Sequence, residues 1–259
     1  MSDHLYIITG ASRGMGLAIA QQLLKPGNFL LCISRQVNES LTNAACAAGA
    51  GLEQWPLDLD HTVEAAAMLS QWLASRKPAA FQSATLINNA AVLPKITPLS
   101  EADPDELAKA LRVGLEAPMQ LTAAFLKGTE HWQAAASSAT MRKVLNISSG
   151  NGRRAMASQS IYSAAKAGMD HFTRCVALEE ALKPNGARVC SLAPGVIDTD
   201  MQVHLRNSDA TSFPDHHRFV DMKTQGQLST PSDAAARLLA YLAHPGFGNN
   251  PVADVRDAL

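Results

Sequence analysis

The sequence predicts an α/β fold in which helices cover both faces of one doubly wound parallel sheet of about seven strands. Short apolar runs rich in β-branched residues alternate with longer amphipathic segments rich in Ala and Leu along nearly the whole chain, an order typical of repeated βαβ units. Most of the short runs are apolar throughout, as expected of strands that are covered on both faces.

The strands are expected at the short apolar runs that end near turn-forming residues. They cover residues 5–9, 29–34, 52–57, 84–88, 143–148 and 187–193, with a short terminal strand near residues 251–255. The helices are expected at residues 14–25, 61–75, 104–127, 161–183 and 231–243. Residues 195–226 form the longest stretch without a clear period, and we expect them to be a loop that shapes a substrate site.

Length and composition narrow the class of protein. A chain of 259 residues, 47% of them hydrophobic, suits a single domain over residues 1–259. The formal net charge is −1 and the basic residues are scattered, so neither nucleic acid nor a membrane is expected as a partner. No export signal or membrane-spanning run is recognisable, which favours a cytoplasmic protein. The cysteines form no CxxC pair and the histidines no HExxH helix, so no metal site is predicted.

A glycine-rich turn links the first predicted strand to the first predicted helix. It reads Gly10-Ala11-Ser12-Arg13-Gly14-Met15-Gly16. After a strand and at the start of a helix, such a turn exposes N–H groups that can bind the pyrophosphate of a dinucleotide, as in Rossmann-type sheets. Gly10 would permit the turn, Gly14 the approach of the cofactor and Gly16 the contact between helix and strand. An ordinary tight βα turn is the alternative for the glycines alone.

The end of the second predicted strand bears on the choice of cofactor. Ser34 and Arg35 stand where an NAD site usually carries an acidic side chain for the ribose hydroxyls. Arg35 and Arg13 can instead pair with the 2′-phosphate of NADP, because guanidinium groups form charge-assisted hydrogen bonds to phosphate. The sequence therefore favours NADP(H) over NAD(H), with solvated surface arginines as the alternative interpretation.

Candidate catalytic residues follow the fifth predicted strand, in NISSG at residues 146–150 and YSAAK at residues 162–166. Tyr162 and Lys166 lie four positions apart, so a helix presents both on one face. Ser149 stands at the carboxyl end of a strand, the edge where open α/β sheets bind ligands. We therefore expect the three side chains to meet beside the cofactor. For the YxxxK spacing alone, an exposed tyrosine with a surface lysine is the alternative.

These side chains suit reduction of a carbonyl group, which needs a hydride at carbon and a proton at oxygen. The pKa of a free tyrosine is about 10, and we expect the Lys166 ammonium to lower the pKa of Tyr162 so that it donates this proton near neutral pH. Ser149 would hydrogen-bond the substrate oxygen.

The order of the motifs resembles that of the short-chain dehydrogenase/reductase family over essentially the whole chain. The segments that carry the resemblance are TGASRGMG at residues 9–16, Asp58 after the third strand, NNA at 88–90, NISS at 146–149, YSAAK at 162–166 and PGVIDT at 194–199. In the family the serine stands close to thirteen positions before the tyrosine, which selects Ser149 over Ser148. The resemblance implies a nicotinamide-dependent carbonyl reductase.

The resemblance also implies further cofactor contacts. Asp58 would hold the adenine amino group, Asn89 would brace the central strands, and Pro194 and Gly195 with Thr199 would enclose the nicotinamide. The adjacent residues Leu59, Ala90 and Val196 complete the expected set. A helix cap at Asp58 and a plain turn at Pro194-Gly195 are the alternatives.

Residues 194–201 look most like the branch that contains sepiapterin reductase and benzil reductase, which suggests a bulky ketone or diketone substrate. The methionines Met156, Met201 and Met222 are expected either in an adaptable substrate pocket or in core gaps. Related proteins pair through the long helices after the fourth and fifth strands, so the resemblance also implies a homodimer or homotetramer.

One position departs from the family pattern. Gly114 stands where many members carry an asparagine that supports a water-linked proton relay to the active-site lysine. We expect water bridging from a backbone carbonyl to Lys166 to replace that side chain, with relief of packing near Pro118 as the alternative. The departure leaves a second function open, an NADP(H)-binding sensor with little turnover, although an intact Ser-Tyr-Lys set favours the enzyme.

Overall fold

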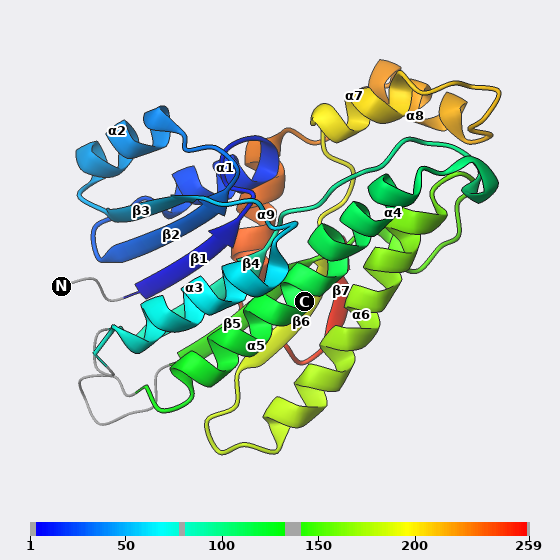
Figure 1. The fold of residues 1–259 in the computed structure, drawn as a ribbon. Helices are drawn as coiled ribbons and strands as arrows, with labels where there is room; N and C mark the ends of the chain where they lie inside the picture. The colour runs from blue at the N-terminus through cyan, green and yellow to red at the C-terminus, as the bar shows by residue number, and fades with distance from the viewer. Residues whose placement is uncertain (1–3, 78–80, 133–140, 258–259) are drawn as a thin grey trace.

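The computed structural model describes residues 4–77, 81–132 and 141–257. Its centre is one seven-stranded sheet of order β3-β2-β1-β4-β5-β6-β7, in which every neighbouring pair is parallel (Figure 1). The strands are β1 (His4–Thr9), β2 (Asn28–Ser34), β3 (Gly51–Pro56), β4 (Ser83–Asn88), β5 (Met141–Ile147), β6 (Arg188–Ala193) and β7 (Val252–Asp254). The strand order reverses between β1 and β4, which confirms the predicted doubly wound, Rossmann-type fold.

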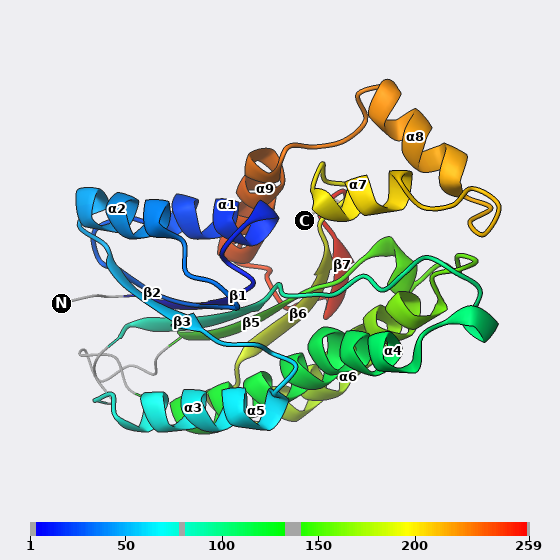
Figure 2. The same ribbon diagram turned by 45° about the horizontal axis from the view of Figure 1, so that its top comes forward.

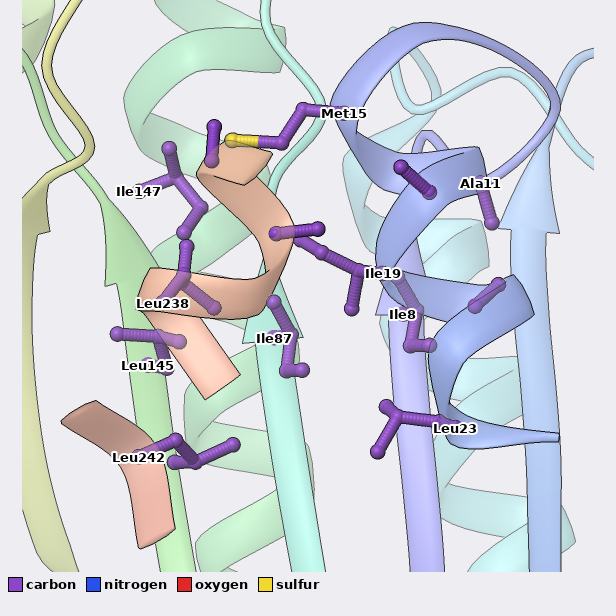
Figure 3. Packing of buried hydrophobic residues seen from close by; sticks show 14 of the residues in the cluster. Ile8, Ala11, Met15, Ile19, Leu23, Ile87, Leu145, Ile147, Leu238 and Leu242 are labelled. Atoms are coloured by element: carbon purple, nitrogen blue, oxygen red, sulfur yellow. The ribbon is translucent and has the colours of Figure 1, made fainter. Parts of the chain in front are cut away.

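Helices cover both faces of this sheet (Figure 2). On one face lie α1 (Gly14–Leu23), α2 (Glu39–Ala48) and α9 (Pro231–Ala243), and on the other α3 (Thr62–Ala74), α4 (Pro104–Leu111), α5 (Ala117–Thr129) and α6 (Ser160–Ala181). A separate apolar cluster fills each layer. Figure 3 shows the first, in which Ile8, Ile87 and Leu145 of the strands meet Ile19 of α1 and Leu238 of α9.

Helix α2 was not among the predicted elements, although its two ends carry recognisable signals. Asn38 precedes the helix, and its side chain accepts a hydrogen bond from Leu41 N at 3.1 Å. Gly49 follows the helix with a φ of +63°, the left-handed conformation that glycine adopts at helix C-termini. Only Leu41 and Ala45 of this helix are buried, so its apolar period is weak.

The helix predicted over residues 104–127 is divided by one π-helical turn, η2 (Arg112–Glu116). Within it Ala117 N–H donates to Arg112 O, one residue farther back than in an α-helix. Pro118 explains this turn, because it lacks an N–H and its ring excludes an α-helical carbonyl at position 114. Gly114 lies within this turn.

The predicted loop at residues 195–226 contains two helices, α7 (Asp200–Arg206) and α8 (His216–Thr224). They lie together beyond the carboxyl ends of the strands (Figures 1 and 2). Leu205, Phe213 and Phe219 form a third apolar cluster with Ile96 there. None of the described helices is both long and apolar enough to span a membrane.

Candidate active site

A cleft of about 760 Å³ lies at the carboxyl ends of the strands, under α7 and α8. Its lining comes from the glycine-rich turn, the ends of the central strands, the start of α6 and the segment that leads into α7. The structure brings together here every residue predicted to bind the cofactor or to act in catalysis. These are Gly10, Ser12, Arg13, Gly14, Met15, Gly16, Ser34, Arg35, Asp58, Leu59, Asn89, Ala90, Ser149, Tyr162, Lys166, Pro194, Gly195, Val196 and Thr199.

The glycine-rich turn depends on glycine at specific positions. Gly10 and Gly14 have φ values of +69° and +56°, which residues with a Cβ rarely adopt. At Gly16 a Cβ would lie 2.2 Å from Gly10 O and 2.5 Å from Asn89 Nδ2. The first turn of α1 contains no acidic side chain. The turn is therefore compact, and it lies at the N-terminus of α1, the positive end of the helix dipole. A pyrophosphate of a dinucleotide fits this position, because its negative charge is stabilised there.

Thr9 and Asn89 hold this turn against the end of β4. Thr9 Oγ1 accepts hydrogen bonds from Asn89 N and Ala90 N, both at 2.9 Å. Asn89 Nδ2 donates to Thr9 O at 2.9 Å and to Gly10 O at 3.3 Å. Asn89 thus braces the two central strands, and Thr9, which sequence reasoning did not select, completes the contact.

The two predicted phosphate-binding arginines differ in their surroundings. Arg13 forms an exposed ion pair with Asp200 at the start of α7, with an Nη1–Oδ2 distance of 2.6 Å. Arg35 is exposed and follows directly after β2. At the next strand end, Asp58 Oδ1 accepts a hydrogen bond from Asp60 N at 3.1 Å while the residue lines the cleft. Asp58 therefore shapes its turn and remains placed to contact a ligand.

Ser149, Tyr162 and Lys166 meet at the inner end of the cleft. A hydrogen bond joins Ser149 and Tyr162, and Lys166 Nζ lies 5.6 Å from the centroid of the Tyr162 ring. Lys166 Nζ donates to Ile147 O at 2.6 Å. Tyr162 and Lys166 are buried. The arrangement places a hydroxyl, a phenol and an amine together at one end of a cleft that begins at the glycine-rich turn.

Burial dominates the acid-base properties of this group. It raises the pKa of Tyr162 to about 12, with the Ser149 hydrogen bond acting in the opposite direction. Burial outweighs the Ser149 hydrogen bond, and Lys166 is not among the causes of the shift. That the Lys166 ammonium lowers the pKa of Tyr162 stays a prediction. Burial also lowers the pKa of Lys166 to about 8, and the charge of Asp170 opposes that shift. At neutral pH Tyr162 keeps its proton and Lys166 is mostly charged.

The cleft also has apolar and polar lining residues outside the catalytic and cofactor-binding set. Met156, Met201 and Met222 all line it, and Met156 and Met222 also pack against the third apolar cluster. Gln202 on α7 lines the cleft as well, and its buried Oε1 accepts no hydrogen bond from the described residues. No sequence motif pointed to Gln202.

Gly114 lies behind the active site. A Cβ at position 114 would be 3.3 Å from Ala165 Cβ, directly before Lys166. The absence of a side chain at position 114 thus allows η2 to pack closely against α6. The water-linked relay to Lys166 stays a prediction.

A doubly wound sheet with a glycine-rich turn and this cleft define the class of dinucleotide-dependent oxidoreductases. Residues 4–210 match the family model described as short chain dehydrogenase, and the chain belongs to this family. Members of the family bind a nicotinamide cofactor.

Two curated relatives and one solved structure agree with this assignment. Benzil reductase ((S)-benzoin forming) of Bacillus cereus is 34% identical over 95% of this chain and 96% of its own. Sepiapterin reductase of Xenopus tropicalis is 28% identical over 98% of this chain and 96% of its own. A metagenomic short-chain oxidoreductase, solved in complex with NADP, is 26% identical, with a TM-score of 0.70 over 98% of this chain and 95% of that chain. The predicted family and branch are thus confirmed.

Proposed function

We propose that this protein reduces a ketone, diketone or related carbonyl compound with NADPH, with Tyr162 as the proton donor. The observation that carries the proposal is the meeting of Ser149, Tyr162 and Lys166 in the cleft that begins at the glycine-rich turn. The similarity to benzil and sepiapterin reductases and the three methionines that line the cleft support a bulky carbonyl substrate.

Each side chain has a distinct part in this chemistry. A bound nicotinamide supplies the hydride that adds to the carbonyl carbon. Ser149 hydrogen-bonds the carbonyl oxygen and holds it beside the phenol. Tyr162 donates its proton to this oxygen as negative charge develops, and its raised pKa keeps that proton available at neutral pH. The Lys166 ammonium stabilises the phenolate that remains and can donate to the cofactor ribose.

The charge of Lys166 predicts how the reaction depends on pH. The pKa of Lys166 is about 8, so the ammonium is present below that pH and is lost above it. We expect kcat for carbonyl reduction to fall as the pH rises through about 8. Steady-state rates with saturating NADPH between pH 6 and 10 will measure this, and a rate that stays level to pH 10 would contradict the role of the ammonium.

The preference for NADPH rests on Arg35 and Arg13. The similar oxidoreductase solved with NADP supports it. We expect Arg35→Asp to raise the KM for NADPH about 10-fold to 100-fold, the equivalent of one charge-assisted hydrogen bond, and to lower the KM for NADH. Arg218→Asp, at the substrate end of the same cleft, is the matched control that leaves the NADPH/NADH ratio unchanged. Equal catalytic efficiency of the wild type with both cofactors would exclude the preference.

Turnover of NADPH with a panel of aromatic diketones, quinones and pterin-like ketones tests the function itself. Oxidation of NADPH that depends on one of these compounds is the expected result. Tight NADPH binding without turnover across the panel would favour the sensor.

We also infer that the protein is cytoplasmic and forms a homodimer or homotetramer. Light scattering after size exclusion can test the oligomeric state. The exposed apolar side chains of Leu178 on α6 and of Leu182, directly after it, support association.

A further inference from the structure

Helix α6 presents three functional groups to the carboxyl end of β5 at intervals of four residues, Tyr162, Lys166 and Asp170. Residues at this spacing lie on one face of a helix, one turn apart. Each meets one of three consecutive residues at the end of β5. The pairs are Tyr162 with Ser149, Lys166 Nζ with Ile147 O at 2.6 Å, and Asp170 Oδ1 with Ser148 Oγ at 2.6 Å.

Asp170 is a buried carboxylate with several strong partners. Its Oδ1 accepts hydrogen bonds from Ser148 Oγ and from Ser191 Oγ of β6, the latter at 2.7 Å. Its Oδ2 lies 3.4 Å from Arg153 Nε, and only 2% of its side chain is exposed. A carboxylate is costly to bury at a position where an apolar side chain would pack without penalty. Its placement is therefore better explained by its charge and its contacts than by packing.

The turn after β5 is fitted closely around this carboxylate. At Gly152, in the short helix η3 (Gly150–Gly152), a Cβ would lie 3.0 Å from Asp170 Oδ2 and 3.0 Å from Lys166 O. Arg153 continues from this turn, and its Nη2 donates to Ala253 O of β7 at 2.7 Å. Asp170 therefore connects the turn that carries Ser149 to α6, β6 and β7.

The same carboxylate acts on the charge of Lys166. Lys166 is buried one turn before Asp170, and burial disfavours its ammonium, whereas the negative charge of Asp170 favours it. The other charged groups on the elements around this face of α6 are Arg153, Lys109, Arg112 and Glu116, and Asp254 with Arg256. The anions in this set, Glu116 and Asp254, have partners of their own in Thr62 and Arg256. Asp170 is the anion whose charge favours the Lys166 ammonium.

We propose that Asp170 is a positioning residue for the reaction described above, holding the backbone that carries Ser149 and keeping the positive charge on Lys166. The proposal rests on the proposed function of Ser149, Tyr162 and Lys166. Asp170 itself contacts neither substrate nor cofactor, and it acts on the reaction only through Ser149 and Lys166.

The test is Asp170→Asn, which keeps the size of the side chain and an oxygen that can accept from Ser148 and Ser191 but removes the charge. Titration of Lys166 is followed by NMR in protein labelled with ¹³C-lysine, without cofactor, and the signal is identified by its loss in Lys166→Arg. We expect the midpoint to fall by about one pH unit or more. The decline of kcat at alkaline pH should move down with it, with a smaller change in KM.

Two further variants separate charge from structure. Ser191→Ala removes one hydrogen bond but keeps the carboxylate, so the titration of Lys166 should stay within a few tenths of a pH unit of wild type. Arg153→Gln removes a cation beside Asp170 and should move the midpoint upward, which provides a test of opposite sign if Asp170→Asn does not fold. An unchanged midpoint in a folded Asp170→Asn, or in Arg153→Gln, would overturn the proposal. Retained turnover in Tyr162→Phe would instead overturn the proposed function and leave this titration unaffected.

Discussion

Tyr162→Phe is expected to lower kcat for NADPH-dependent carbonyl reduction by about 10²-fold to 10⁴-fold, the usual contribution of a positioned proton donor. The substitution removes the phenolic oxygen and leaves the ring, so the packing of the cleft should change little. Burial raises the pKa of Tyr162 to about 12, so the phenol is protonated at neutral pH. Its hydrogen bond with Ser149 marks the position at which a substrate oxygen would lie. The loss should therefore appear in kcat, with NADPH binding within a few-fold of wild type.

Tyr6→Phe is the matched control for this experiment. Tyr6 lies on β1 outside the cleft and also has a pKa raised by burial. The same chemical change there should leave kcat near that of wild type. Single-turnover measurement of NADPH oxidation, with the binding of NADPH determined separately by fluorescence, distinguishes the chemical step from binding. Near-normal kcat in Tyr162→Phe would exclude the phenol as the proton donor.

Gly16→Ala is expected to weaken NADPH binding by about 10-fold to 100-fold or more. The new Cβ would lie 2.2 Å from Gly10 O and 2.5 Å from Asn89 Nδ2, so the glycine-rich turn must move away from α1. Displacement of the turn removes one or more charge-assisted hydrogen bonds to the pyrophosphate, each contributing about 1.5–3 kcal/mol. Overpacking should also lower the free energy of unfolding by about 1–3 kcal/mol.

Gly128→Ala provides the comparison, because it introduces a close contact elsewhere. Its Cβ would lie 2.8 Å from Leu73 Cδ1 and 2.9 Å from Leu73 Cβ, on α3. Leu73 is buried, so we expect a similar loss of stability of about 1–3 kcal/mol but unchanged NADPH affinity. Calorimetric titration with NADPH and urea denaturation measure both properties. Wild-type affinity in Gly16→Ala would show that the turn does not hold the cofactor.

The sequence was sufficient for the sheet and for most residues of the candidate site, although Thr9 and Gln202 were missed. Most strands are apolar on both faces, as β2 and β4 are, so their positions could be read without tertiary information. The glycine-rich turn, Ser149, Tyr162 and Lys166 were also predictable, because they stand at strand ends and at helical spacing, which a parallel sheet brings to one edge. Helix α2 was missed because only two of its residues are buried, too few to give a clear apolar period. Asn38 and Gly49 nevertheless mark its ends.

The sequence by itself determined a doubly wound sheet, because the sheet follows from the local period of its apolar runs. Spacing together with the resemblance of its motifs to a known family indicated the residues that the carboxyl edge gathers. Only the tertiary structure decided the acid-base balance of the site. Burial raises the pKa of Tyr162 to about 12, and the charge of Asp170 opposes the lowering of the pKa of Lys166. Asp170 accepts hydrogen bonds from Ser148, directly after β5, and from Ser191 on β6. Solvation and the hydrogen bonds between separate elements are properties of the packed molecule, and no spacing along the chain encodes them.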